Sequence, residues 1–175
     1  MAEGIFLPDA ETIAFRIPDG AKLAIFKDCG VAMDVTRALI RRGVRGLHIV
    51  TVPTGAFQTE LLIAAGCVET VETSGVTMWE HGQAPAFVRA VKSGEVKIID
   101  STCPAIYAQL QAAEKGIPFI PIRGLIGSDI VANRDDYKII DNPFAENDPI
   151  IVLPAIYPDI ALFHAPKADK FGNVW

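Results

Sequence analysis

The sequence predicts an α/β fold with an open, largely parallel sheet flanked by helices on both faces. Two observations lead to this prediction. Short apolar segments of strand length alternate with helix-like segments between residues 22 and 122, as is typical of parallel strands joined by crossover helices. One strand segment is also apolar at successive positions, which is expected where helices cover both faces of a sheet. In such folds functional groups gather at the carboxyl ends of the strands.

The first half of the chain contains three expected strands, each followed by a helix or a loop. KLAIF (22–26) precedes a helix over 31–43, in which Val31, Val35 and Leu39 share one face and Gly43 ends the helix. GLHIVTV (46–52) is rich in β-branched residues, and FQTELLIAAG (57–66) has helical character. The alternation in CVETVETSG (67–75) indicates the third strand.

The second half repeats this scheme and then becomes irregular. A helix is expected to open at Pro85, and Ser101 and Thr102 are expected to cap another that begins at Pro104. IPFIPI (117–122) indicates a short extended run whose prolines favour an edge strand or a strand end, because proline lacks the N–H that a central strand needs. Beyond residue 120, Gly, Asn, Asp and Pro favour loops with short strands inside them. The remaining expected strands are VKIID (96–100), IIVLPA (150–155) and DIALFHA (159–165).

The composition indicates one globular domain spanning residues 1–175. Half of the residues are hydrophobic and 21% are charged, which supports a packed interior. The formal net charge is -5. A nucleic-acid partner is therefore not expected, because phosphate binding requires clustered Lys and Arg.

The cysteines and the N-terminal segment indicate a cytoplasmic protein. Cys29, Cys67 and Cys103 lack the spacing of zinc sites or of a disulfide framework, so reduced, buried thiols are expected. The first residues carry acids where a secretory leader needs positive charge. No apolar run reaches the roughly 18 residues of a membrane span, so no membrane association is expected.

Glu80 is the principal catalytic candidate. It lies between the end of an expected strand and the start of the next helix, where a doubly wound sheet opens its crevice. A carboxylate at this position can act as a nucleophile on an acyl group or as a general base, if apolar neighbours such as Trp79 restrict water. The alternative is that Glu80 only favours the positive end of the following helix. The local sequence leaves both readings open.

Two further loops at strand ends are candidate binding elements. In TVPTGA, Thr54 and Gly55 can offer backbone N–H groups to an anion or oxyanion. In KDCGVA, Gly30 allows close approach to the backbone, and Cys29 is a weaker nucleophile candidate near a helix start.

Other common catalytic signatures are missing from the sequence. There is no phosphate-binding Gly-Lys-Ser/Thr loop, no dinucleotide fingerprint and no serine nucleophile elbow. His48 lies inside an apolar strand and is expected to be a satisfied core histidine. His81 and His164 lack metal-ligand spacing, so no metal site is expected.

Five segments, taken in order, resemble the α-subunit type of family I acyl-CoA transferases, the group of glutaconate and 3-oxoacid CoA-transferases. The first two are ALIRRGVRGLHIVTVPTG and LLIAAGCVETVE, and the third is WEHGQAPAFVRAVKSGEV, in which Glu80 is followed by His81 and Gly82. The last two are AAEKGIPFIPIRGLIGSD and PDIALFHAPKADKFGNV. The resemblance covers nearly the whole chain, although the fit at Gly82 is approximate.

This resemblance implies an α-type subunit that pairs with a β-type partner to form a hetero-oligomer. In such enzymes CoA passes from an acyl-CoA thioester to a small carboxylic acid through a glutamyl thioester, whose glutamate normally belongs to the β-type chain. Glu80 would occupy the pseudo-equivalent strand end in the other half. The resemblance further implies a crevice lined by Glu80, His81 and Gly82 together with Gly30, Thr54 and Gly55. Coenzyme A thioester is implied as substrate, with no permanently bound cofactor.

Two departures from the family pattern leave alternatives open. FKDCGVA replaces a Gly-Gly-Phe-like loop, so that Gly30 is its only clear remnant. The sequence ends after ADKFGNVW, where members of the family continue, which indicates a shortened subunit or one completed by another chain. The alternatives on the same fold are a CoA-thioester hydrolase, a ring-opening C–C lyase, and a non-catalytic assembly subunit.

Overall fold

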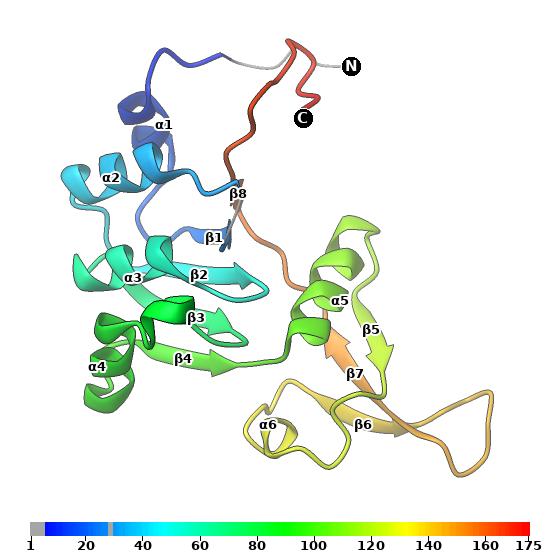
Figure 1. Ribbon diagram of the computed structural model, residues 1–175. Helices are drawn as coiled ribbons and strands as arrows, with labels where there is room; N and C mark the ends of the chain where they lie inside the picture. Colours follow the sequence, from blue (N-terminus) through cyan, green and yellow to red (C-terminus); the bar gives the residue numbers. More distant parts are fainter. Residues whose placement is uncertain (1–5, 28–29) are drawn as a thin grey trace.

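The fold is built on a parallel sheet, as the sequence predicts. The computed structural model describes residues 6–27 and 30–175. Within these residues five parallel strands form a sheet in the order β4-β3-β2-β1-β8 (Figure 1). The strands are β1 (Lys22–Phe26), β2 (Leu47–Val52), β3 (Val68–Thr73), β4 (Lys97–Asp100) and β8 (Ile160–Leu162). The α/β prediction is confirmed.

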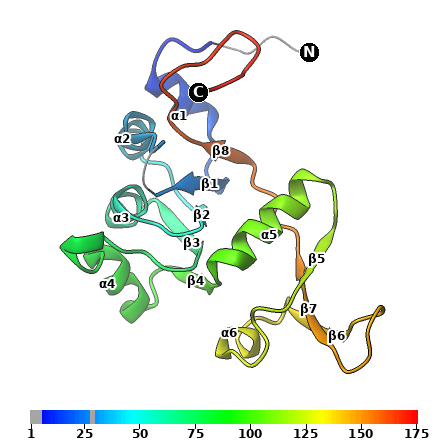
Figure 2. The ribbon, with the colours of Figure 1, turned by 45° about the vertical axis from the view of Figure 1, so that its right-hand side comes forward.

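Helices lie on both sides of this sheet, and they cover the two faces unequally. In Figure 2, α2 (Met33–Arg42), α3 (Phe57–Ala64) and α4 (Pro85–Ser93) lie along one face, with α1 (Ala10–Arg16) beside α2, whereas α5 (Cys103–Glu114) lies on the other. The main core lies beneath the helical layer and includes Leu23, Ile49 and Val71. A smaller cluster beneath α5 contains Val50, Ile106 and Ile156. The helices bury most of one face and only part of the other.

Local signals explain most of the helix boundaries. Gly43 and Gly94 end α2 and α4 in the left-handed conformation that glycine tolerates best. Pro85 opens α4, and the Thr102 side chain caps α5, which begins at Cys103, one residue earlier than expected. The helix α1 was not predicted, although the Asp9 side chain caps it by accepting a hydrogen bond from the Thr12 N–H.

The segments beyond residue 117 form a second, separate sheet. β5 (Phe119–Ile122), β7 (Pro149–Pro154) and β6 (Lys138–Asp141) pair in an antiparallel arrangement, with the short helix α6 (Asp129–Ala132) between β5 and β6. Of the two positions predicted for IPFIPI, an edge strand or a strand end, the structure shows an edge strand, and its sheet is a separate antiparallel one. We call β5, α6, β6 and β7 the antiparallel unit. Among the described residues, no helix is long and apolar enough to cross a membrane.

Candidate active site

The loops that follow β2 and β3 are tied together at the carboxyl end of the sheet. The Gly55 N–H donates to the Gly75 carbonyl at 2.9 Å, and the Thr77 N–H donates to the Gly55 carbonyl at 3.1 Å. The Ser74 hydroxyl donates to the Pro53 carbonyl at 2.9 Å. These contacts fix the start of the β3–α4 loop, which carries Glu80.

Glu80 lies in a single 3-10 turn, η1 (Trp79–His81), and its side chain is exposed. Its carboxylate forms no hydrogen bond or ion pair with a described residue. Trp79 beside it has φ 55°, unusual for a residue with a side chain, and Lys27 Nζ lies 3.3 Å from the centroid of the Trp79 ring. This contact links η1 to the end of β1. Because Trp79 is 59% exposed, it does not by itself exclude water from Glu80.

The start of α4 is occupied by a different carboxylate. Glu60, in α3, is only 7% exposed, and it accepts hydrogen bonds from the N–H groups of Ala86 at 2.6 Å and Phe87 at 3.0 Å. A carboxylate at a helix N-terminus satisfies free N–H groups and complements the helix dipole. Glu60 therefore has the structural role that was the alternative reading of Glu80. Sequence reasoning missed Glu60, and its only local signal is an acid within an apolar helix.

The two residues after Glu80 shape its turn. The His81 N–H donates to the Met78 carbonyl at 3.0 Å, and the Met78 N–H donates to the Gly82 carbonyl at 2.9 Å. Gly82 has φ 90° and ψ -145°, a conformation that is open essentially only to glycine. The side chain of His81 is exposed. Gly82 thus closes a tight loop that presents Glu80 and His81 to solvent.

The predicted backbone donors differ in availability. The sequence predicts that the Gly55 N–H binds an anion or oxyanion. In the structure this N–H already donates to the Gly75 carbonyl, so that prediction is wrong. A Cβ on Gly55 would lie 2.7 Å from Thr59 Oγ1, so close packing accounts for this glycine. Thr54 is half-buried, and its N–H donates to no described residue. Of the two predicted donors, Thr54 is therefore the one whose N–H has no acceptor among the described residues.

The loop after β1 is described only in part. Cys29 lies outside the described residues. Gly30 has φ 79°, and its carbonyl accepts a hydrogen bond from the His164 N–H at 2.7 Å. Gly30 is thus held against the segment that follows β8.

The two described cysteines have different surroundings. Cys67 is buried, and burial raises the pKa of its thiol. Cys103 is exposed at the start of α5, and its Sγ lies 3.2 Å from Ser74 Oγ. The expectation that both thiols are buried is wrong for Cys103, because the first residues of α5 lie at the surface.

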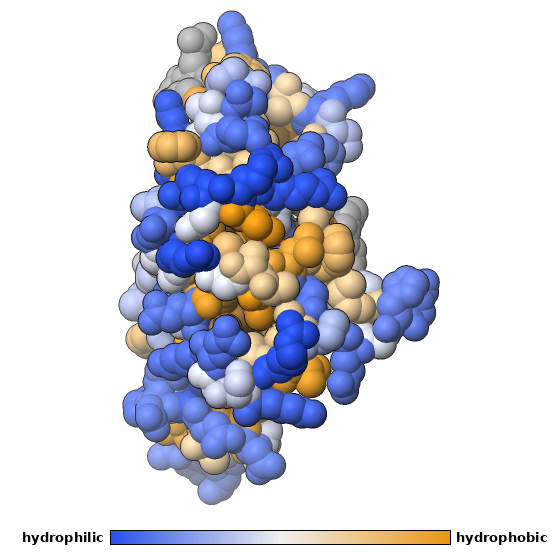
Figure 3. All heavy atoms as spheres, turned by 90° about the vertical axis from the view of Figure 1, so that its left-hand side faces the viewer, coloured by the Kyte–Doolittle hydropathy of each residue, from blue (hydrophilic) through white to orange (hydrophobic). Residues whose placement is uncertain are grey.

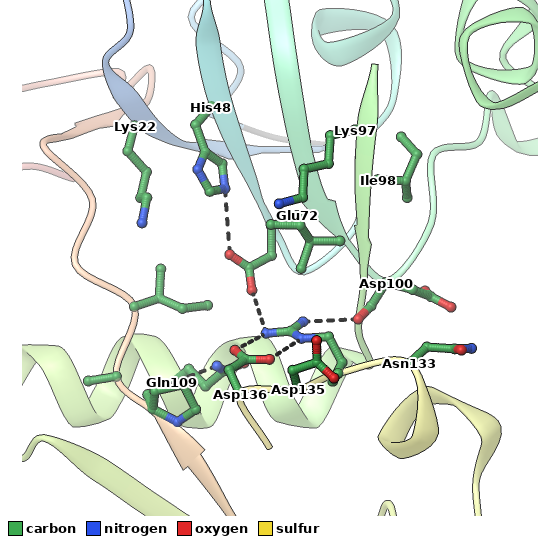
Figure 4. A pocket seen from close by; sticks show the side chains of 15 residues that line it. Lys22, His48, Glu72, Lys97, Ile98, Asp100, Gln109, Asn133, Asp135 and Asp136 are labelled. Atoms are coloured by element: carbon green, nitrogen blue, oxygen red, sulfur yellow. Dashed lines mark hydrogen bonds and ion pairs between the residues drawn. The ribbon is translucent and has the colours of Figure 1, made fainter. Parts of the chain in front are cut away.

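A polar cavity of about 740 Å³ separates the second face of the parallel sheet from the antiparallel unit. Figure 4 shows Lys22, His48 and Lys97 projecting from the strands into this cavity near Glu72. His48 Nε2 lies 3.6 Å from Glu72 Oε2 and forms no hydrogen bond within the described chain. The expectation of a satisfied core histidine is therefore wrong. In the described part of the chain, no group of His, Cys, Asp and Glu is arranged to hold a metal.

Arg134 closes the opposite side of this cavity. Its Nη2 donates to Glu72 Oε1 at 3.1 Å and to Asp136 Oδ2 at 2.8 Å, and its Nη1 donates to the Asp100 carbonyl at 3.0 Å. Burial acts to lower the pKa of Arg134, but the hydrogen bond to Asp136 and the nearby negative charges outweigh it and raise that pKa. The hydrogen bond from Arg134 in turn lowers the pKa of Asp136. The sequence reading did not single out Glu72 or Arg134, because they are 62 residues apart.

Comparison with known proteins agrees with the resemblance seen in the sequence. Residues 9–175 match the model of the family described as Coenzyme A transferase. The chain is 30% identical to one of the subunits of 3-oxoadipate CoA-transferase from Pseudomonas knackmussii, over 78% of this chain and 49% of that protein. It is 31% identical to the cholesterol ring-cleaving hydrolase IpdA subunit of Rhodococcus jostii, over 81% of this chain and 49% of that protein.

A solved structure shares the arrangement over nearly the whole chain. The decarboxylase AibA/AibB superposes with a TM-score of 0.83 and 28% identity, over 96% of this chain and 65% of that one. The chain spans about half the length of the two curated relatives named above. The family match extends over all the elements from α1 to β8. This chain belongs to the coenzyme A transferase family.

Proposed function

We propose that the chain is the α-type subunit of a CoA transferase. It moves CoA between an acyl-CoA thioester and a small carboxylic acid, in an active site shared with a β-type partner subunit. The observation that carries this proposal is the position of Glu80 within a member of this family. Its carboxylate is exposed on a strand-end loop, and Glu60 already caps the following helix.

The chemistry divides between the two subunits. The partner's glutamate is the nucleophile that carries the glutamyl thioester, and Glu80 faces the same crevice as a second carboxylate, acting as a general base. The free N–H of Thr54 donates to the negative charge that develops on the thioester carbonyl oxygen. The partner covers η1 and excludes the water that Trp79 alone does not. Gly30, Gly55 and Gly82 shape the three loops around this crevice.

A second candidate is a CoA-thioester hydrolase or a ring-opening C–C lyase on the same fold. It is favoured by the similarity to a decarboxylase and to one chain of a ring-cleaving hydrolase. In this reading Glu80, beside His81, activates water or the acyl chain.

The exposed free thiol of Cys103 fits the reducing conditions of the cytoplasm, where we propose that the complex acts.

The decisive experiment uses the chain together with its co-purified partner. Acyl-CoA is incubated with the complex, with and without an acceptor carboxylate, and both thioester loss and newly formed acyl-CoA are measured. Thioester loss that requires the acceptor and yields its CoA ester supports the transferase. Loss without acceptor supports the hydrolase, and no turnover with a range of acyl-CoA thioesters would favour a non-catalytic role in assembly.

The role of Glu80 is tested in the same assay. Glu80→Gln is expected to lower kcat by about 10²–10⁴, the range for loss of a general acid–base group. Glu95→Gln, which alters another exposed carboxylate, serves as the matched control and is expected to retain full activity. Unchanged turnover by Glu80→Gln would remove its catalytic role.

A further inference from the structure

The turn η1 is closed by hydrogen bonds between its own residues and those beside it. The Gly82 N–H donates to the Trp79 carbonyl at 2.9 Å, and the Met78 N–H donates to the Gly82 carbonyl at 2.9 Å. The Trp79 N–H donates to Thr77 Oγ1 at 3.2 Å. These bonds fix the shape of the turn. They do not fix the angle at which it stands against the neighbouring strand ends, because each joins residues within 77–82.

The backbone of Trp79 is held in an unfavourable conformation. Its φ of 55° brings the Cβ of a bulky residue close to the backbone carbonyl oxygen, a region that side chains of this size avoid. Burial of the ring does not compensate, because Trp79 is 59% exposed. Strained residues of this kind persist where surrounding contacts hold them, and they gather at functional sites.

Lys27 supplies a contact that holds the Trp79 ring. It directly follows β1, and its Nζ lies 3.3 Å from the centroid of that ring, where an ammonium is attracted by the negative face of the indole. The ammonium forms no ion pair with a described carboxylate, so its charge remains available to the ring. Because β1 pairs with both β2 and β8, Lys27 is attached to a fixed strand end. The contact therefore sets the tilt of η1 against the sheet.

We propose that Lys27 is a positioning residue for Glu80 and that it acts through Trp79. This inference rests on the catalytic role proposed above for Glu80. Trp79 and Glu80 are consecutive, so a rotation about the Trp79 backbone moves the Glu80 carboxylate with it. With the ring held over Lys27, the carboxylate stays at the crevice. Without the ammonium, Trp79 relaxes toward negative φ and the carboxylate turns away.

The strength of the contact sets the size of the expected effect. A cation–π contact shifts a conformational equilibrium about fivefold at an exposed site and about thirtyfold when it is desolvated. The partner subunit proposed to cover η1 would desolvate the pair. Loss of the Lys27 ammonium should therefore lower kcat about fivefold to thirtyfold. This loss is smaller than that expected for Glu80→Gln, because the carboxylate is displaced only part of the time.

Steady-state kinetics of the complex with its partner test the proposal. Lys27→Met removes the charge at similar length and is expected to lower kcat with KM unchanged. Lys27→Arg should keep kcat, because a guanidinium also stacks on aromatic rings. Lys92→Met is the matched control. Lys92 is exposed on α4, on the helical side of the molecule that Figure 3 shows to be largely hydrophilic, so full activity is expected.

A double-mutant cycle separates positioning from direct contact with substrate. Trp79→Leu removes the ring, so Lys27→Met should lower kcat no further in that background. A further fall by the full factor, or a rise in KM, would show that Lys27 contacts the substrate itself and would overturn the proposal. Full turnover by Lys27→Met, in a complex that Glu80→Gln inactivates, would overturn it alone. Full turnover by Glu80→Gln would instead remove the catalytic role of Glu80, and this inference with it.

Tryptophan fluorescence tests the contact without reference to activity. The chain has two tryptophans, so in the full chain carrying Trp175→Phe the emission comes from Trp79. Lys27→Met should shift this emission to longer wavelength as the ring is released to water, and Lys27→Arg should leave it in place. Far-UV circular dichroism checks each fold, and Lys27→Gln replaces Lys27→Met if the latter fails to fold. An emission unchanged by loss of the ammonium would show that the contact does not hold the ring.

Discussion

Glu72 of β3 and Arg134, which follows α6, form a buried ion pair across the polar cavity. Their carboxylate and guanidinium atoms lie 3.1 Å apart, and their side chains are only 6% and 7% exposed. Arg134 also donates to the Asp100 carbonyl at the end of β4. This pair connects the parallel sheet to the antiparallel unit.

Removing the Arg134 guanidinium should destabilise the protein strongly. Arg134→Leu leaves the Glu72 carboxylate buried without its main partner, and we expect a loss of about 3–5 kcal/mol in the free energy of unfolding. Urea denaturation measures this loss. The control is Arg123→Leu, which breaks the ion pair between Arg123 and Asp148. Because Arg123 is exposed, this ion pair is expected to contribute at most about 1 kcal/mol to the free energy of unfolding. Equal losses in the two variants would show that burial of the Glu72 pair has no energetic consequence.

Glu60 and Glu80 should separate stability from activity. Glu60→Ala removes the acceptor for the N–H groups of Ala86 and Phe87, so we expect a loss of about 1–3 kcal/mol in unfolding free energy. Glu80→Ala removes an exposed side chain and should change stability by less than about 0.5 kcal/mol. Thermal or urea unfolding compares the two. A Glu80→Ala variant as unstable as Glu60→Ala would contradict the assignment of the α4 cap to Glu60.

Gly55 is expected to be required for packing. A Cβ at this position meets Thr59 Oγ1 at 2.7 Å and Thr51 Cγ2 at 3.0 Å, and overpacking of this kind costs about 1–3 kcal/mol. Gly55→Ala should therefore lower the melting temperature, and adding Thr59→Ala should partly restore it. Thr54→Ala keeps the backbone N–H and serves as the control, with little expected change. If Thr59→Ala gives no relief, the contact with Thr59 is not the cause.

The acid titration of Asp148 provides a direct test of its surroundings. Hydrogen bonds from Arg123 and Asn142 lower the pKa of Asp148 from 3.8 to about 2. A carboxyl whose pKa is lower in the folded state stabilises the fold above pH 3.8, and this contribution disappears as the pH falls through about 2. NMR titration of the side-chain carboxyl should show the low pKa, and Arg123→Gln should raise it toward 3.8. A parent pKa near 3.8 would contradict these contacts.

The sequence by itself determined the α/β class, most strand and helix positions, and the family. These features depend on signals within short stretches of chain: apolar periodicity, glycine at helix ends, proline at the start of α4, and ordered motifs. The same signals predicted an edge strand or a strand end for IPFIPI. They did not identify its partners, because antiparallel pairing with β7 joins segments about thirty residues apart along the chain.

Only the tertiary structure decided which polar groups are already engaged. Sequence position gave Glu80 and Gly55 plausible roles, but the cap of α4 comes from Glu60, 26 residues before Ala86, and the Gly55 N–H is bonded to Gly75. The buried pair of Glu72 and Arg134 likewise depends on a contact between distant residues. Such contacts leave no periodic signal in the chain, because each depends on how separate elements pack against one another.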